Sequence, residues 1–198
     1  MSDAPKPVLA AHAPVAEYES LFVGHIADHL ERAPKPLTAL DFSCGRGVAT
    51  RGVHGHLPPG SRVVAIGDDR PDLNIFHQEM TPAQRNAIFL RKESATRLPF
   101  AEGAFDLAWA SLATHRLEGE RKHVLRQVIR ALRPPGQLLI ATPLRETVVE
   151  LRSAITSILQ SEGESSVRAL LEEDTSLTSA DEWQEACKKA GAVEVGVT

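Results

Sequence analysis

Apolar and polar positions follow a regular order through the middle of the chain. Short apolar runs of strand length are separated by segments in which apolar residues recur at helical spacing. The runs predict five strands, one that ends at Asp41 and four at residues 62–66, 87–91, 104–110 and 137–142. Strands that alternate with helices build a mainly parallel sheet with helices on both faces. The predicted fold class is α/β, doubly wound and Rossmann-like.

Two of the predicted helices carry a start signal. Thr81–Gln84 and Ser179–Glu182 are capping boxes, in which side chains at both ends bond free backbone N–H groups. The second helix ends at Gly191, and residues 193–197 predict a sixth strand. Further helices are predicted at residues 17–30, 72–80, 118–132, 147–159 and 167–173.

The outer parts of the chain differ from this alternating centre. Residues 1–15 are rich in Ala and Pro and predict a disordered N-terminal arm. Residues 16–198 predict a single domain, within which the helical segment 145–180 is expected to form a lid over the sheet.

Composition narrows the classes of function. Of the 198 residues 42% are hydrophobic and 24% charged, and the net charge is −4, so no basic surface for nucleic acid is indicated. Two cysteines are no disulfide framework and fit a reducing compartment. We find no secretory signal and no apolar run near the roughly 20 residues of a membrane span. These features predict a cytoplasmic protein that binds neither nucleic acid nor membrane.

The segment 41–47, Asp-Phe-Ser-Cys-Gly-Arg-Gly, follows the first strand and precedes a helix. Gly45 and Gly47 allow positive φ angles and leave the main chain bare. A strand, a glycine loop and a helix in this order expose backbone to a nucleotide-like ligand. The pair His25 and His29 could chelate a metal, but no third ligand is near, so solvated histidines and no metal are favoured.

Four segments resemble the class I S-adenosylmethionine-dependent methyltransferases, in particular small-molecule methyltransferase-like domains. They are ALDFSCGRG at 39–47, VVAIGDD at 63–69, ESATRLPFAEGAFDLAWA at 93–110 and VLRQVIRALRPPGQLLIATP at 124–143. The resemblance implies S-adenosylmethionine as cofactor and a seven-stranded sheet with an antiparallel last pair. Only six strands are predicted here, so either the sequence is shortened or the protein has lost the final strand. An edge left unpaired by such a loss would favour association with a second copy, such as a homodimer.

The resemblance also implies cofactor-binding residues in the glycine loop. Asp41, Gly45 and Gly47 match the family pattern, whereas Ser43 replaces its first glycine. The resemblance places Asp41 near the methionine amino group.

Two further positions come from the ends of the second and third strands. The ribose-binding acid of the family falls on Gly67, so Asp68 or Asp69 could replace it, although Asp69 could equally cap the next helix. The adenine-binding acid falls on Ser94, which is followed by Ala95.

One residue is a candidate for proton transfer. His115 follows the fourth strand and could act as a base toward an acceptor, or be a loop histidine at the rim. Phe105 and Trp109 are expected in the core and Asp106 at the strand start, while Cys44 has no basic neighbour that would make it a nucleophile.

Three hypotheses follow. The chain transfers methyl groups from S-adenosylmethionine to an unidentified, small-molecule acceptor, or it is a catalytically inactive methyltransferase-like domain that binds a partner protein or dimerises. A nicotinamide-type dinucleotide enzyme ranks last, because Gly45-x-Gly47-x-x-Thr50 lacks the third glycine.

Overall fold

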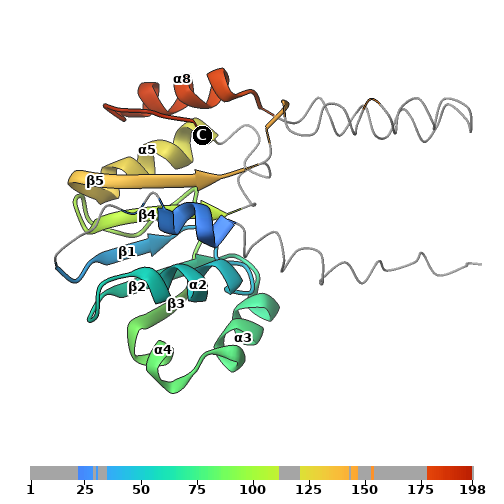
Figure 1. The fold of residues 1–198 in the computed structure, drawn as a ribbon, viewed down its shortest axis with the longest axis vertical. Coiled ribbons are helices and arrows are strands. Elements are labelled where there is room, and N and C mark those ends of the chain that lie inside the picture. The colour runs from blue at the N-terminus through green and yellow to red at the C-terminus, as the bar shows by residue number, and fades with distance from the viewer. Residues whose placement is uncertain are drawn as a thin grey trace, which may run out of the picture.

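The structure, a computed structural model, describes residues 22–28, 30, 35–111, 121–142, 144–146, 153 and 178–197. Within them five parallel strands form one sheet in the order β3-β2-β1-β4-β5. The strands are β1 (Thr38–Asp41), β2 (Arg62–Gly67), β3 (Ile88–Lys92), β4 (Phe105–Ser111) and β5 (Leu132–Ala141). The predicted α/β, doubly wound architecture is therefore confirmed (Figure 1).

Helices connect and cover the strands (Figure 1). Residues 22–28 are helical and precede β1. Both predicted capping boxes are present, with Thr81 bonding Gln84 before α4 and Ser179 bonding Glu182 before α8. Helices α4 and α8 are two of five labelled helices among the described residues. Their bounds are α2 (Val48–His56), α3 (Arg70–Glu79), α4 (Pro82–Ala87), α5 (Arg121–Ala131) and α8 (Ala180–Ala190).

The hydrophobic core has two sides because successive strand residues point to opposite faces of the sheet. On one face, Trp109 of β4 and its neighbours contact the helix at 22–28, α2 and α3. On the other face, Leu40 of β1 and its neighbours contact α5. Helix α8 lies on α5, where Trp183 packs against Leu125. This places helices on both faces of the sheet, as predicted.

The sequences Leu98-Pro99-Phe100 and Phe105-Asp106, both within the segment 93–110, have a structural role. Leu98 is buried, and the rings of Phe100 and Phe105 meet edge to face with centroids 5.0 Å apart. Asp106 accepts a hydrogen bond from the Thr38 backbone N–H at 2.8 Å and pairs with Arg133 at 3.2 Å. Asp106 therefore joins the start of β4 to the start of β1, in agreement with its predicted structural role.

The predicted strand at 193–197 is wrong. These residues form no strand and pair with no described strand, and Val193 is 94% exposed. Apolar alternation makes a strand only where a partner and a core face are available. The outer edge of β5 likewise has no strand partner among the described residues, and association with a second copy stays a prediction.

Several predicted boundaries shift. Strand β5 begins at Leu132, before the Pro-Pro-Gly sequence, and its pairing with β4 is irregular between Phe105 and Leu107. Ala87 ends α4 rather than starting β3. The arm at 1–15 and the helices at 147–159 and 167–173 lie outside the described residues, save Ser153, which is helical. No described helix has the length and apolarity that crossing a membrane requires.

Candidate functional site

The glycine loop lies at the carboxyl end of β1, the central strand. Backbone bonds tie it to both neighbouring strands, because Phe42 N–H donates to the Trp109 carbonyl at 3.1 Å and Cys44 N–H to the Ile66 carbonyl at 3.0 Å. Strand order reverses here, since β2 lies on one side of β1 and β4 on the other. Ligands of open α/β sheets bind at such a switch point.

Gly45 and Gly47 serve the loop in different ways. Gly47 has φ +79°, and a Cβ built on it would lie 2.3 Å from the Phe76 ring, so only glycine fits against α3. Gly45 has φ +48°, and a Cβ there would meet no atom within 4 Å. Gly47 is therefore required by packing, whereas Gly45 leaves bare main chain beside open space.

Asp41 is a buried carboxylate, 2% exposed, bonded by the protein itself. One oxygen accepts from Thr50 Oγ1 at 2.7 Å and from Trp109 Nε1 at 2.9 Å, and the other accepts from Ser43 N–H at 3.0 Å. These bonds fix the start of the loop to α2 and β4. Asp41 thus supports the loop, and its predicted closeness to a ligand amino group stays a prediction.

Two buried hydroxyls at this edge lack hydrogen-bond partners among the described residues. They are Ser43 Oγ, just after β1, and Ser111 Oγ, at the end of β4. Because β1 and β4 are neighbouring parallel strands, both serines lie at the same edge of the sheet. Buried polar atoms are nearly always hydrogen-bonded, and an unpaired one calls for a missing partner such as a ligand group.

The end of β2 carries the predicted replacement for the ribose-binding acid. A Cβ on Gly67 would lie 3.3 Å from Cys44 Sγ and 3.4 Å from a Leu73 methyl carbon, so little room exists for an acid at 67. Asp68 and Asp69 follow and are both exposed. Asp69 is the N-cap residue of α3, but its side chain makes no capping bond.

The Cys44 thiol reports which acids lie near the loop. Burial raises the pKa of Cys44 most, and the carboxylates of Asp41, Asp72 and Asp68 raise it further. Asp68 and Asp69 both stay predictions for the acid that binds a ligand ribose. The raised pKa also keeps Cys44 protonated, which agrees with its predicted inertness as a nucleophile.

The predicted adenine position, Ser94, lies in a turn after β3. Its hydroxyl is 2.8 Å from Thr96 Oγ1 and accepts from Thr96 N–H at 3.2 Å. The turn is tied to α5 by a 2.6 Å hydrogen bond between His123 Nε2 and the Thr96 carbonyl. Ser94 is exposed and Ala95 is partly buried, so both are held at the carboxyl edge beside β2.

The predicted residues thus fall into two groups. Those of the glycine loop, with Asp68, Asp69, Ser94 and Ala95, all follow strands at the same edge of the sheet. His115 lies outside the described residues. The sequence-based prediction missed Ser111 and Asp72, and the partners of Asp41. Ser111 becomes a candidate only once β1 and β4 are known to be neighbours.

A sequence profile described as "Methyltransferase domain" matches residues 40–140, just over half of the 198 residues. The chain belongs to the methyltransferase domain family. The matched range contains the second half of β1, all of β2 to β4 and nearly all of β5, with the whole glycine loop. The predicted family resemblance is confirmed.

Relatives of this methyltransferase domain have different acceptors in their names. The malonyl-[acyl-carrier protein] O-methyltransferase of Dechloromonas aromatica is 32% identical over 62% of this chain and 43% of its own length. The demethylmenaquinone methyltransferase of Lactiplantibacillus plantarum is 28% identical over 50% of this chain and 42% of its length. The chain thus spans less than half the length of these curated relatives.

The fold is also shared with solved structures. Geranyl diphosphate C-methyltransferase from Streptomyces coelicolor A3(2), in complex with S-adenosyl-L-homocysteine, superposes with a TM-score of 0.67 at 18% identity. The match covers 88% of this chain and 60% of that chain. At this identity the likeness shows the fold alone.

Proposed function

We propose that this methyltransferase domain binds S-adenosylmethionine at the glycine loop and transfers its methyl group to a small-molecule acceptor. Family membership supports the cofactor, and one structural observation supports its place. The open space at Gly45 adjoins a loop whose buried Ser43 hydroxyl has no partner, and Ser111 offers a second such hydroxyl. These are the features expected of main chain left free for a ligand.

The residues at this edge fit the parts of that cofactor. Gly45 and Gly47 would present backbone to it, and Ser43 and Ser111 would hydrogen-bond its polar amino-acid end. Asp68 or Asp69 would accept from the ribose hydroxyls, because a carboxylate can receive two such bonds. Ser94 and Ala95 would lie at the adenine, where a hydroxyl can bond the exocyclic amine.

Methyl transfer from this cofactor depends mainly on how the cofactor and the acceptor are positioned. When bound, S-adenosylmethionine supplies a methyl group that its sulfonium has already activated. The loop, held by Asp41 through Thr50 and Trp109, keeps its backbone in one arrangement, and orientation of this kind can supply much of a rate enhancement. His115 is proposed to take a proton from the acceptor, as its ordinary pKa range suits.

The acceptor is proposed as a small organic molecule from the relatives' names alone. Two relatives and one solved structure act, by name, on demethylmenaquinone, on malonyl-[acyl-carrier protein] and on geranyl diphosphate. Their differences give no single acceptor for this chain.

Calorimetric titration with S-adenosylhomocysteine tests the proposal. We expect micromolar binding to the wild-type chain and none to Gly45→Val, because the branched side chain would fill the open space beside the loop. Gly55→Val is the matched control, since a Cβ at Gly55 also meets no atom within 4 Å but lies at the far end of α2. No heat at millimolar ligand with the wild-type protein would contradict the proposal and favour the inactive, partner-binding alternative.

A further inference from the structure

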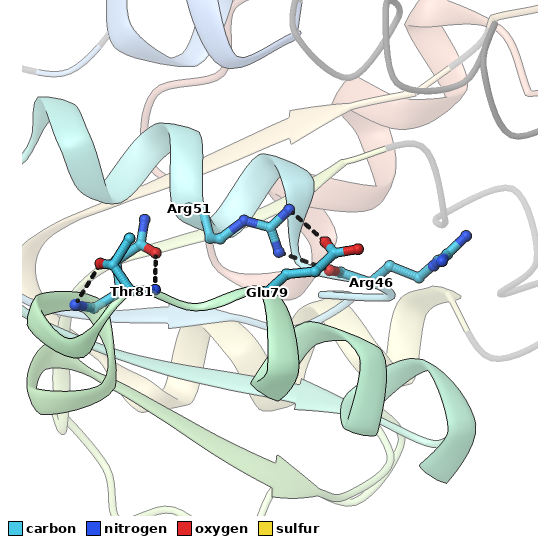
Figure 2. A network of polar contacts seen from close by, with 5 residues as sticks. Arg46, Arg51, Glu79 and Thr81 are labelled. Atoms are coloured by element: carbon cyan, nitrogen blue, oxygen red, sulfur yellow. Dashed lines mark hydrogen bonds and ion pairs between the residues drawn. The ribbon is translucent and has the colours of Figure 1, made fainter.

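A single arginine, Arg51, holds the glycine loop through both its side chain and its backbone. Arg51 of α2 donates from Nη1 to the Arg46 carbonyl at 3.1 Å and from Nη2 to Glu79 Oε2 of α3 at 2.9 Å (Figure 2). The Arg51 backbone N–H also donates to the Gly47 carbonyl at 3.0 Å. The loop is thereby joined to two helices through one residue.

The same arginine lies on the aromatic ring that packs against Gly47. The guanidinium carbon of Arg51 is 5.5 Å from the centroid of the Phe76 ring, which is fully buried. Because Phe76 fills the space that a Cβ on Gly47 would need, ring and guanidinium together restrain residues 46 and 47. Gly45, next in the chain, remains beside open space.

The Arg51 side chain is 20% exposed and that of Glu79 is 46% exposed, so the ion pair itself should add little to stability. The planar fork of Arg51 matters because it reaches a carboxylate and a carbonyl at once. Such bonds from a charged, geometrically fixed donor are about twice as strong as neutral ones. A lysine has a single point of charge and could not make both bonds in this geometry.

We infer that Arg51 is a positioning residue for cofactor binding: it holds the Arg46 carbonyl and the Phe76 ring so that the loop is preorganised. Rigid preorganisation raises affinity, because the loop does not have to be ordered when the ligand binds. This inference rests on the proposed function for its ligand, but the restraint on the loop exists without one.

The test compares Arg51→Ala with Arg133→Ala. Arg133 is matched, since it also binds one carboxylate, that of Asp106 at 3.2 Å, and one carbonyl, that of Ala104 at 3.1 Å. It lies at the amino end of the sheet, next to the start of β4, away from the loop. Both variants should lose similar, modest stability in urea denaturation.

Affinity and hydrogen exchange separate a positioning role from a merely structural one. Arg51→Ala should bind S-adenosylhomocysteine about tenfold more weakly, equal to about 1.4 kcal/mol, while Arg133→Ala binds as the wild type does. Arg51→Lys, which can restore only the ion pair, should lie between wild type and Arg51→Ala. In the unliganded protein, amides of residues 42–49 should exchange faster in Arg51→Ala than in Arg133→Ala.

The two readouts keep the inference separate from the proposed function. If the wild-type protein binds no S-adenosylhomocysteine, the proposed function fails, and faster loop exchange in Arg51→Ala still supports the restraint. If loop exchange in Arg51→Ala matches that in Arg133→Ala, or if Arg51→Ala binds with wild-type affinity, the inference is overturned.

Discussion

The polar groups at the amino ends of β1 and β4 differ in their hydrogen bonding from those at the carboxyl ends. At the amino end, Asp106 is bonded by the Thr38 N–H and by Arg133, which also bonds the Ala104 carbonyl. At the carboxyl end, the buried hydroxyls of Ser43 and Ser111 have no partner within the part of the chain that the structure describes. The same two strands therefore end in one cluster that is complete within the protein and one that is not. A complete cluster supports the fold, and an incomplete one marks where a ligand would bind.

The largest effect should come from the glycines at the two ends. Gly47 at the carboxyl end and Gly103 at the amino end both have positive φ, +79° and +64°, so alanine is strained at either. A Cβ on Gly103 would be an ordinary 3.5 Å from Arg133 Cβ, whereas one on Gly47 would lie 2.3 Å from the Phe76 ring. Gly47→Ala should therefore cost about 3 kcal/mol of unfolding free energy and Gly103→Ala about 1 kcal/mol.

Urea denaturation of the two glycine variants measures this difference. Equal losses for Gly47→Ala and Gly103→Ala would show that backbone strain alone matters and that the Phe76 ring moves aside at little cost.

The second-largest effect should be a loss of affinity for S-adenosylhomocysteine in two serine variants, with little change in their stability. Ser43→Ala and Ser111→Ala each remove a buried hydroxyl that the protein does not use, so unfolding free energy should stay within about 0.5 kcal/mol of wild type. Each should weaken S-adenosylhomocysteine binding about fivefold, because a hydrogen bond to the ligand is lost. Calorimetry and urea denaturation on the same samples separate the two quantities.

Thr50→Val is the matched control for the serine variants. Thr50 is also a buried hydroxyl, but it donates to Asp41 at 2.7 Å. Its loss leaves a buried carboxylate short of a donor and should cost about 2 kcal/mol of stability. If the serine variants lose as much stability as Thr50→Val, their hydroxyls are paired within the folded protein and the contrast between the two ends fails.

The smallest effect is expected at the amino end. Asp106→Asn removes the charge that faces Arg133, whose side chain is 49% exposed, so the loss should be about 1 kcal/mol or less. Ligand affinity should be unchanged. An Asp106→Asn variant that folds normally but binds S-adenosylhomocysteine poorly would contradict the division of roles between the two ends.

Local sequence signals predicted much of the fold. The strands β1 to β4 followed from short apolar runs. Both capping boxes followed from a hydroxyl residue three positions before Glu or Gln. Each of these signals depends only on neighbours in sequence. The strand expected at 193–197 failed because a strand needs a partner, and no local pattern supplies one. The start of β5 was misplaced because Pro134 and Pro135 signal a break rather than extended chain.

The candidate site was less accessible to sequence. Gly45 and Gly47 were identified together, yet only the structure shows that Phe76 requires one and open space surrounds the other. Asp41 and Trp109 are 68 residues apart, and their hydrogen bond arises from the pairing of β1 with β4. Ser111 belongs to no sequence motif, and it becomes a candidate site residue only through the same pairing.

The bond between Trp109 and Asp41 has an optical consequence. Trp109 is fully buried, and its indole N–H points at the carboxylate from which the loop starts. Because the dipole of an indole changes on excitation, its emission energy should depend on the position of that charge. Strand β4 thus carries one of the two tryptophans of the chain in a hydrogen bond to the carboxylate at the start of the loop, and its emission should shift when that carboxylate moves.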